Sequence, residues 1–489
     1  MSYWNFICYA ICTTAIFSYC PYMTDTYILP KWLFTLVFLT SIGILYGFWI
    51  IKGKSPNINI NHLYSSTVIL CYLQSIYAIL QHIDIMPSTS IFKVVGSFDN
   101  PAGLAACISP SIPICIFKFC NSKKTYEKCV IAVIILTIVI ALTLSKSRAG
   151  IIAGIFVPLI WTLYKLKSRF WIKSIFTFAI ISSLLFMYVA KKDSADGRLL
   201  MIYCGIEMIK EKPIMGFGPR GIDAYYMNYQ AKWLSEHPNS NLAYLADNVK
   251  SVFNEYLSIG ICYGIVGLIL IGIYIYSIIS IHYKVKTKES TCAIMTLATI
   301  GVLSCFSYPL TYPFSWIIII INTFIILRPK LPFKLINHKN VRTAISFLVI
   351  SISSLFTYFV GERIHAEVEW CRLSKISNSE TRNQTILDSY EKLTRQLGNE
   401  PFFLYNYAIQ HYIAGNYIQS LQIAQECSNY WADYDLELLQ GELFYNLKRY
   451  DEALIHYKHA STMCPIRITP LYKIYQISVV SNKSKLIVL

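Results

Sequence analysis

The chain alternates between long apolar stretches and short polar ones, with one long polar interruption. Apolar runs of about 17–25 residues are long enough to cross a bilayer as helices. The pattern predicts an all-α, polytopic membrane helix bundle. We expect the first run to be a retained helix and not a signal peptide, because no basic region precedes it and no small-residue cleavage site follows. Eleven runs occur, at about 4–20, 31–51, 63–83, 101–119, 127–145, 149–166, 171–189, 253–281, 291–308, 312–327 and 342–360.

The long polar interruption separates the seventh run from the eighth. It covers residues 191–252 and holds arginines, carboxylates and clustered glycines. Membrane-spanning helices seldom carry ionisable groups except for function, so we expect the chemistry to lie in this loop. Within it the pattern predicts an amphipathic helix from Leu199 to Lys210, ended by Pro213. The turn Gly216-Phe-Gly-Pro then presents Arg220.

The last part of the chain loses the membrane pattern and gains an internal repeat. Tyr407-Ala408 followed by Gly415-Asn-Tyr417 aligns with Gln440-Gly441 followed by Lys448-Arg-Tyr450, at an offset of 33 residues. This spacing is similar to the tetratricopeptide period of about 34; the alternative is an ordinary pair of helical hairpins. The predicted parts are N-terminal transmembrane helices, large loop, C-terminal transmembrane helices, connector and repeat domain, at 1–190, 191–252, 253–360, 361–385 and 386–489.

Composition agrees with a membrane protein, and charge predicts its orientation. Only 14% of residues are charged and mean hydropathy is +0.46, whereas soluble domains carry about 25% charged residues. The net charge of +16 does not indicate nucleic-acid binding, because eighteen lysines and arginines lie in one set of short loops and four in the alternate set. The positive-inside rule therefore places the N-terminus in the cytoplasm, and the loop and the C-terminal domain outside.

The fifteen cysteines lie mostly within apolar runs, where a free cysteine behaves as a small apolar residue. No cysteine or histidine spacing is typical of a zinc site, so we expect no metal. Cys427 and Cys464 fall in the C-terminal domain. They either form a disulfide or remain free thiols.

Two short turns predicted on the external side carry candidate binding residues. In Gly96-Ser-Phe-Asp-Asn-Pro-Ala-Gly-Leu-Ala105, Asn100 can cap the following helix, so this turn is either a helix start alone or part of a site. In Leu144-Ser-Lys-Ser-Arg-Ala-Gly150, Lys146 and Arg148 oppose the charge bias. Arginine's planar fork suits phosphate oxygens, which indicates an anionic ligand. The alternative is that both side chains extend to lipid headgroups.

The end of the large loop supplies a third group of candidates. Asp247-Asn-Val-Lys-Ser-Val-Phe-Asn-Glu-Tyr256 leads into the eighth apolar run. Glu255 stands where that run begins. It is either a general base or a solvated carboxylate at a helix end.

The order of these motifs resembles a known family. Gly-x-Phe-x-Asn, Ser-Arg-x-Gly, Gly-Arg, Pro-x-x-Gly-x-Gly and Asn-Glu-Tyr follow one another over residues 90–275, as in the O-antigen ligase and O-antigen polymerase superfamily. The resemblance implies transfer of a glycan from an undecaprenyl-diphosphate carrier to an acceptor hydroxyl, without metal or other cofactor. It also implies a bacterial inner membrane protein acting at the periplasmic face.

Roles for the arginines follow from the same resemblance, and roles for the other residues follow from their places in the motifs. Catalytic roles fall to Arg148 and Arg198, which would hold the diphosphate, and to Glu255. Substrate-binding roles fall to Asn100, Lys146, Arg220, Asn254 and Tyr256. The implied partners are the lipid-linked glycan, an acceptor glycan, lipid or protein, membrane lipids, and a protein partner on the repeats; nucleic acid is not among them.

The chain departs from the family pattern at one position. The ligases carry a histidine, ten residues and a glycine at the end of the large loop. Here the spacing runs from Phe253 to Gly264, so phenylalanine takes the histidine position. Phenylalanine cannot accept a proton. Glu255 would then be the base, or the acceptor differs from the usual one, or the chain is inactive.

Several functions remain open from sequence alone. Ligase, polymerase and protein O-glycosyltransferase would share these motifs. A non-enzymatic transporter of lipid-linked glycans is a rival, although a transporter should place charges near the middle of the membrane and the apolar runs hold few. An envelope scaffold that recruits enzymes through the repeats is a further alternative.

Overall fold

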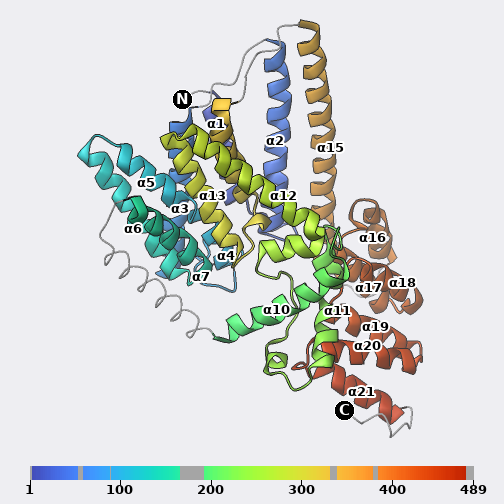
Figure 1. Cartoon of the computed structure of the whole chain (residues 1–489). Coiled ribbons are helices and arrows are strands. Elements are labelled where there is room, and N and C mark those ends of the chain that lie inside the picture. Colours follow the sequence, from blue (N-terminus) through green and yellow to red (C-terminus); the bar gives the residue numbers. More distant parts are fainter. Residues whose placement is uncertain are drawn as a thin grey trace. The chain divides into compact units, whose positions relative to one another are not determined.

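The computed structural model describes residues 3–52, 59–88, 90–165, 192–330, 339–377 and 384–480. These residues form α-helices joined by turns, short 3-10 segments and one π-helical stretch, and no strand occurs among them (Figure 1). The predicted all-α class is confirmed. The chain divides into two compact units, Met1–Leu184 with Gly272–Ile364 and Leu185–Ile271 with His365–Leu489, called the first and the second unit below.

The first unit contains the apolar helices of both halves of the chain. Their order is α1 (Tyr3–Phe17), α2 (Ile28–Ile51), α3 (Ile60–His82), α4 (Pro101–Ile108), α5 (Ser111–Asn121), α6 (Thr125–Leu144), α7 (Arg148–Ile151), η1 (Ile152–Phe156), α8 (Val157–Lys165), the second part of α12 (Glu255–Val285), α13 (Lys288–Ser304), η3 (Pro309–Thr311), α14 (Pro313–Leu327), η4 (Arg328–Lys330) and the first part of α15 (Lys339–Ser377).

Six described segments are long and apolar enough to cross a membrane, so the protein is a multi-pass membrane protein. The run predicted at 291–308 forms α13, and the run predicted at 171–189 lies outside the described residues. The six are Ile28–Ile51, Ile60–His82, Pro101–Asn121, Thr125–Leu144, Glu255–Val285 and Lys339–Ile376; shorter apolar helices cover Phe6–Phe17, Arg148–Trp161 and Pro313–Leu327.

Small residues on α4 allow its neighbours to approach closely. A Cβ added to Gly103 would lie 2.7 Å from the Tyr312 ring, and one added to Gly150 would lie 2.6 Å from the Ala105 Cβ. Helices in membranes associate through such small-residue contacts, because lipid supplies no hydrophobic drive between them. The turn that starts α7 is thereby fixed against α4.

The second unit contains the predicted large loop together with the C-terminal helices. Its elements are α10 (Lys192–Glu211), α11 (Gly221–Glu236), η2 (Asn241–Leu245), the first part of α12, the end of α15, α16 (Gln384–Leu397), α17 (Pro401–Ile413), α18 (Tyr417–Ser428), α19 (Tyr434–Asn446), α20 (Tyr450–Met463) and α21 (Thr469–Val480).

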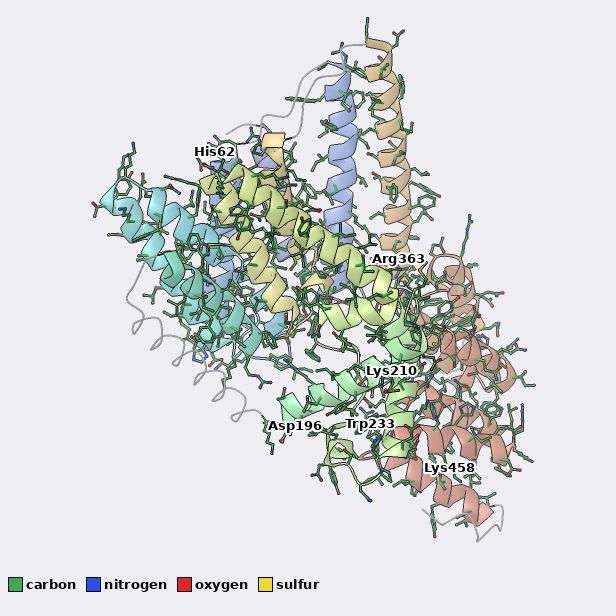
Figure 2. All side chains as sticks on the ribbon, viewed as in Figure 1. His62, Asp196, Lys210, Trp233, Arg363 and Lys458 are labelled. Atoms are coloured by element: carbon green, nitrogen blue, oxygen red, sulfur yellow. The ribbon has the colours of Figure 1, made fainter. Side chains whose placement is uncertain are left out.

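The predicted loop is largely helical. The helix expected from Leu199 to Lys210 is longer in the structure, since α10 begins at Lys192. Leu200, Cys204 and Met208 follow one another at four-residue intervals and are buried, the spacing of one helix face. Trp233 of α11, labelled in Figure 2, stacks on the rings of Tyr203 and His237 at 5.8 and 4.3 Å.

The loop helices and the C-terminal helices share one apolar core. Met208 and Tyr226 from the loop are buried in the same cluster as Met463 and Cys464. The Gln230 side-chain amide donates to the Met463 carbonyl at 2.9 Å. The two parts therefore share this cluster, in addition to a core that the C-terminal helices form among themselves, and the predicted boundaries within 191–489 remain predictions.

The C-terminal helices repeat with the predicted period. α17 and α19 begin 33 residues apart, and so do α18 and α20. The small residue expected in the repeat is Gly441, where an added Cβ would lie 2.5 Å from the Tyr457 ring. Assignment of these hairpins as tetratricopeptide repeats remains a prediction. Cys427 and Cys464 are both buried free thiols.

Candidate functional site

Asn100 is held at the start of α4 by two backbone N–H groups, two tyrosine hydroxyls and the Asp99 carboxylate. Its side-chain oxygen accepts from the N–H groups of Ala102 and Gly103 at 2.8 and 3.0 Å, which is an N-cap. Its side-chain nitrogen donates to the hydroxyls of Tyr308 at 2.8 Å and Tyr312 at 3.2 Å. The cap and the tyrosines thus fix this amide completely.

Asp99 is a candidate that the sequence reasoning missed, although it lies in the same quoted turn. The Tyr312 hydroxyl donates to its carboxylate at 2.8 Å. Burial raises the pKa of Asp99, and hydrogen bonds from Tyr312 and Asn100 lower it in part. Lys31 is fully buried in the same unit, with its ammonium 5.0 Å from the centroid of the Phe98 ring. The first unit therefore holds both a half-buried carboxylate and a buried cation beside the Asn100 cap.

The turn with Lys146 and Arg148 is tightly built. Lys146 is exposed and has φ +56, a backbone conformation uncommon for residues other than glycine. Ser147 caps α7 by accepting from the Gly150 N–H at 3.3 Å. Arg148 is the first residue of α7 and is half-buried. A π-helical stretch follows directly, at Ile152–Phe156, and such stretches are frequent at functional sites.

The structure brings Arg198 and Phe253 together in the second unit. The guanidinium carbon of Arg198 lies 4.9 Å from the centroid of the Phe253 ring. A cation over an aromatic face is stabilised by the negative charge of that face. Phe253 itself has φ +52, which is strained for a bulky side chain and costs about 1–3 kcal/mol. The family's histidine position is thus occupied by a strained residue that supports an arginine.

The residues after Phe253 start α12. The Asn254 side-chain oxygen accepts from the Leu257 N–H at 3.0 Å, so Asn254 caps this helix. Glu255 and Tyr256 are its first two residues, and both are half-buried. A carboxylate in a first helical turn is favoured by the helix dipole. The structure therefore gives Asn254 a structural role and places Glu255 directly beside it.

The Pro-x-x-Gly-x-Gly motif forms what we call the glycine clasp, residues 213–218 paired with residues 261–266. Backbone N–H groups of Phe217 and Gly218 donate to the carbonyls of Ile261 and Cys262, both at 2.9 Å. Those of Ile265 and Val266 donate to Pro213 and Ile214 at 2.8 and 3.3 Å.

Three glycines make this pairing sterically accessible. Gly216, Gly218 and Gly264 have φ +66, +90 and +59, values that only glycine adopts without strain. A Cβ at Gly264 would clash with the carbonyl oxygen of Ile214, and one at Gly216 would lie 2.5 Å from the Cys262 carbonyl carbon. The clasp breaks the regular path of α12 at Gly264. The glycine spaced after Phe253 is therefore a kink residue.

A comparison with protein families matches residues 131–272 to the family described as O-antigen ligase. The matched segment is similar to the O-antigen ligase family. The match supports, in general terms, a glycosyltransferase-like enzyme of the ligase or polymerase type. Comparisons with curated proteins and with solved structures found no match.

The matched segment includes every site residue predicted from the sequence except Asn100. Lys146 and Arg148 belong to the first unit, whereas Arg198, Arg220 and the Asn254–Tyr256 segment belong to the second. Asn100 and Asp99 precede the matched segment. Among the described residues, no group of three or more histidine, cysteine, aspartate or glutamate side chains is placed to hold a metal ion.

Arg220, within the matched segment, is bound by the residues between α16 and α17. Its guanidinium forms an ion pair with Glu400 at 2.8 Å and also donates to the Asn399 carbonyl. The turn expected to present Arg220 to substrate thus presents it to the residues before α17. A substrate-binding role for Arg220 remains a prediction, and it requires exchange of these partners.

Proposed function

We propose that the protein transfers a glycan from undecaprenyl diphosphate to an acceptor hydroxyl at the periplasmic face of a bacterial inner membrane. The observation that carries the proposal is the O-antigen ligase match over residues 131–272, which contains both Arg148 and Arg198. Two arginines suit a diphosphate, because each guanidinium offers paired N–H donors to phosphate oxygens.

The contact between Arg198 and Phe253 supports a binding role for this arginine. When an aromatic ring covers one face of a guanidinium, the N–H groups at its edge remain available within the plane. The ring lies 4.9 Å from the guanidinium carbon, so it restricts the orientation of the cation. In this proposal Phe253 replaces the proton-accepting function of the family's histidine with a positioning function.

The proposed reaction is a single displacement. The acceptor hydroxyl oxygen forms a bond with the anomeric carbon, and the bond from that carbon to the diphosphate oxygen breaks. Undecaprenyl diphosphate leaves with the electron pair while Arg148 and Arg198 stabilise its negative charge. Glu255 accepts the proton of the hydroxyl. The remaining candidates, Asn100, Lys146, Arg220, Asn254 and Tyr256, would position the substrates.

Orientation in the membrane is part of the proposal. The charge bias of the short loops favours a cytoplasmic N-terminus, with the O-antigen ligase loop and the C-terminal helices in the periplasm. Reporters fused near residue 120 should then be cytoplasmic, and those at the C-terminus periplasmic. A cytoplasmic C-terminal reporter would contradict the periplasmic site.

The test is a transfer assay with purified protein in lipid nanodiscs. The donor is a defined oligosaccharide on undecaprenyl diphosphate, and the acceptors are a lipid A–core preparation, the same glycan and a hydroxyl-rich peptide. Arg148→Ala and Arg198→Ala should each lower transfer at least about 100-fold, the range for loss of one preorganised charge-stabilising group. Arg→Lys should restore only part of it, because an ammonium cannot reproduce bidentate contact.

Arg372→Ala is the matched control, because its exposed guanidinium pairs with Glu369 in the connector region. It should retain wild-type transfer. Product size identifies the reaction: a single addition to lipid A–core indicates a ligase and a ladder of repeats a polymerase. Full transfer in both arginine-to-alanine variants, at equal protein levels, would refute the arginine roles.

A further inference from the structure

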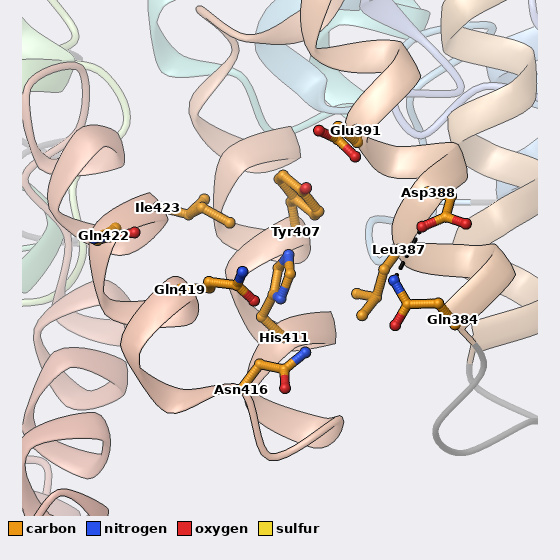
Figure 3. Close-up of a pocket in the computed structure, with 10 residues that line it drawn as sticks. All are labelled: Gln384, Leu387, Asp388, Glu391, Tyr407, His411, Asn416, Gln419, Gln422 and Ile423. Atoms are coloured by element: carbon orange, nitrogen blue, oxygen red, sulfur yellow. Dashed lines mark hydrogen bonds between the residues drawn. The ribbon is translucent and has the colours of Figure 1, made fainter.

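A cavity of about 420 Å³ opens on the C-terminal helices (Figure 3). Its walls come from α16, α17 and α18, and the turn at Asn416 forms one end. This volume falls within the range of small-molecule sites, about 300–1,000 Å³. All of its lining residues lie beyond the O-antigen ligase match, which ends at residue 272.

The floor of the cavity contains a buried histidine with an unused nitrogen. His411 is 7% exposed, and its Nδ1 has no hydrogen-bond partner within the part of the chain that the structure describes. Its ring lies 4.8 Å from that of Tyr407, which lines the same floor. Buried polar atoms are normally hydrogen-bonded. His411 lines the cavity although this nitrogen is itself covered, so a ligand hydroxyl reaches it only when the side chain turns.

The walls supply both acceptors and donors. Asp388 and Glu391 on α16 provide carboxylates, and Asp388 already accepts from the Gln384 amide at 3.0 Å. Gln419 and Gln422 on α18 face them across the cavity, as Figure 3 shows. Among the residues that the structure describes, no lysine or arginine lines the cavity. This lining disfavours a phosphate or another anion.

We propose that this cavity binds a neutral sugar residue of a glycan. A sugar hydroxyl both donates and accepts, so it can use the carboxylates and the amides together, whereas an ammonium or guanidinium group can only donate. The unused His411 nitrogen would take one hydroxyl. Tyr407 stacks on Tyr390 at 5.6 Å, and its other face would pack against the C–H groups of the sugar ring, which carry the slight positive charge that an aromatic face attracts.

A glycan site here would act separately from the transfer chemistry. Binding of one sugar holds the rest of the same chain at a raised effective concentration, without any new contact at the reacting atoms. The inference goes beyond the proposed function, and it does not depend on whether Arg148 and Arg198 bind diphosphate. It is therefore tested by binding alone.

The experiment measures binding to full-length protein in nanodiscs by saturation-transfer NMR and calorimetry. The probes are chitobiose and the oligosaccharide released by mild acid from the lipid-linked pool of the producing cells. His411→Phe keeps an aromatic ring and removes both ring nitrogens. It should weaken binding about five- to tenfold, the value of one neutral hydrogen bond. The double variant Gln419→Ala/Gln422→Ala should do the same with little risk to folding, because both side chains are exposed.

Gln425→Ala is the matched control, since Gln425 is an exposed glutamine of the same helix outside the cavity lining. It should bind as wild type does. Arg148→Ala should also bind as wild type does, so loss of transfer and loss of sugar binding are distinguishable. Unchanged binding in the double glutamine variant would overturn the proposal.

A second experiment tests whether the cavity binds a sugar or a basic peptide. Asp388→Asn/Glu391→Gln removes both negative charges and keeps acceptor oxygens at the same places. Binding of the sugar probes should weaken only by about five- to tenfold, because an amide oxygen still accepts from a hydroxyl, although less strongly than a carboxylate does. If trilysine binds the wild type and loses affinity in this variant, while neither sugar probe binds, the cavity is a cation site and the proposal is wrong.

Discussion

Two helix starts in this protein share an asparagine cap and differ on both sides of it. Asp99, Asn100 and Pro101 start α4, whereas Phe253, Asn254 and Glu255 start α12. Both asparagines accept from N–H groups of the first helical turn. The cap explains each asparagine without any ligand.

The neighbours of the two caps indicate where chemistry can occur. Asn100 lies between Asp99, whose carboxylate accepts a hydrogen bond from the Tyr312 hydroxyl, and Pro101. The polar side chains at this helix start are hydrogen-bonded to one another. Beside Asn254 lie a strained phenylalanine that supports Arg198 and a carboxylate at the first helical position. The first start is built for rigidity. The second carries a cation and a potential base.

The largest expected effect tests whether Glu255 is a general base or a solvated carboxylate at a helix end. Glu255→Gln keeps the shape of the side chain and removes its basicity. If Glu255 is the base, kcat should fall by about 10²–10⁴-fold with little change in KM for the donor. Glu207→Gln, an exposed glutamate of α10, should leave kcat unchanged. If Glu255→Gln is silent and Phe253→His adds nothing, no base is needed at this position.

The next largest effect concerns the Phe253 ring, which contacts the Arg198 guanidinium. Phe253→Leu keeps an apolar side chain and removes the aromatic face. Transfer should fall by about 2- to 30-fold, which corresponds to the 0.5–2 kcal/mol of a cation–π contact. Phe253→Tyr should keep most of the activity, because it keeps the face. Equal rates for leucine and tyrosine variants in the same assay would remove the positioning role from Phe253.

Aspartate substitutions test the two caps against each other. Asn254→Asp keeps the capping oxygen and should leave thermal stability nearly unchanged. Asn100→Asp also keeps that oxygen, but it replaces the donor to two tyrosines and places a second carboxylate beside Asp99. We expect it to lower stability by about 1–3 kcal/mol through unsatisfied polar groups. The unfolding midpoint in detergent reports both, and equal midpoints would show that the two caps are equivalent.

The smallest effect is a pH dependence at Asp433, the cap of α19. Its carboxylate accepts from the Asn248 side chain at 2.7 Å and from the Asp435 N–H at 2.8 Å. Burial nevertheless raises the pKa of Asp433. A raised folded-state pKa means that the folded protein holds this proton more tightly than the unfolded chain. Its contribution to stability is therefore lost as pH rises from the ordinary carboxyl range through the folded pKa.

Asp433→Asn removes that dependence. The unfolding midpoint of the variant minus that of the wild type should increase between about pH 4 and about pH 7. We expect this difference in unfolding midpoint to rise by about 1–3 °C for a folding unit of this size. Differential scanning calorimetry gives both midpoints. A difference that stays constant with pH would show that burial of this carboxyl has no energetic consequence.

Local sequence patterns predicted the helices well, because apolar length and period are local properties. The membrane helices and the 33-residue spacing of α17 and α19 both follow from such patterns. The packing of the loop on the C-terminal helices could not be predicted from such patterns. A hydrogen bond such as that from Gln230 to Met463 joins residues 233 positions apart. The single-sequence pattern contains no signal for that pairing.

The candidate site was predictable in residue type and not in arrangement. The motifs pointed to Arg198 and to the unusual Phe253 separately, but contact between them depends on how α10 meets the start of α12. Asp99 could have been noticed, because a carboxylate next to a cap in an apolar context is uncommon. The left-handed backbone conformation of Phe253 could not have been predicted, because the residue type does not indicate it.

The glycine clasp has a consequence for how this enzyme class could be engineered. Its hydrogen bonds join backbone to backbone, so they fix the two ends of the segment between Gly218 and Ile261 without using any side chain within it. That segment can be treated as an exchangeable cassette whose insertion points are held at a constant separation. Its exchangeable part is the stretch between α11 and Phe253, where sequences of other lengths and compositions could be grafted while Pro213, the three glycines, and Phe253, Asn254 and Glu255 are kept. Substrate preference could then be varied by cassette exchange while α12 retains its path through the bilayer.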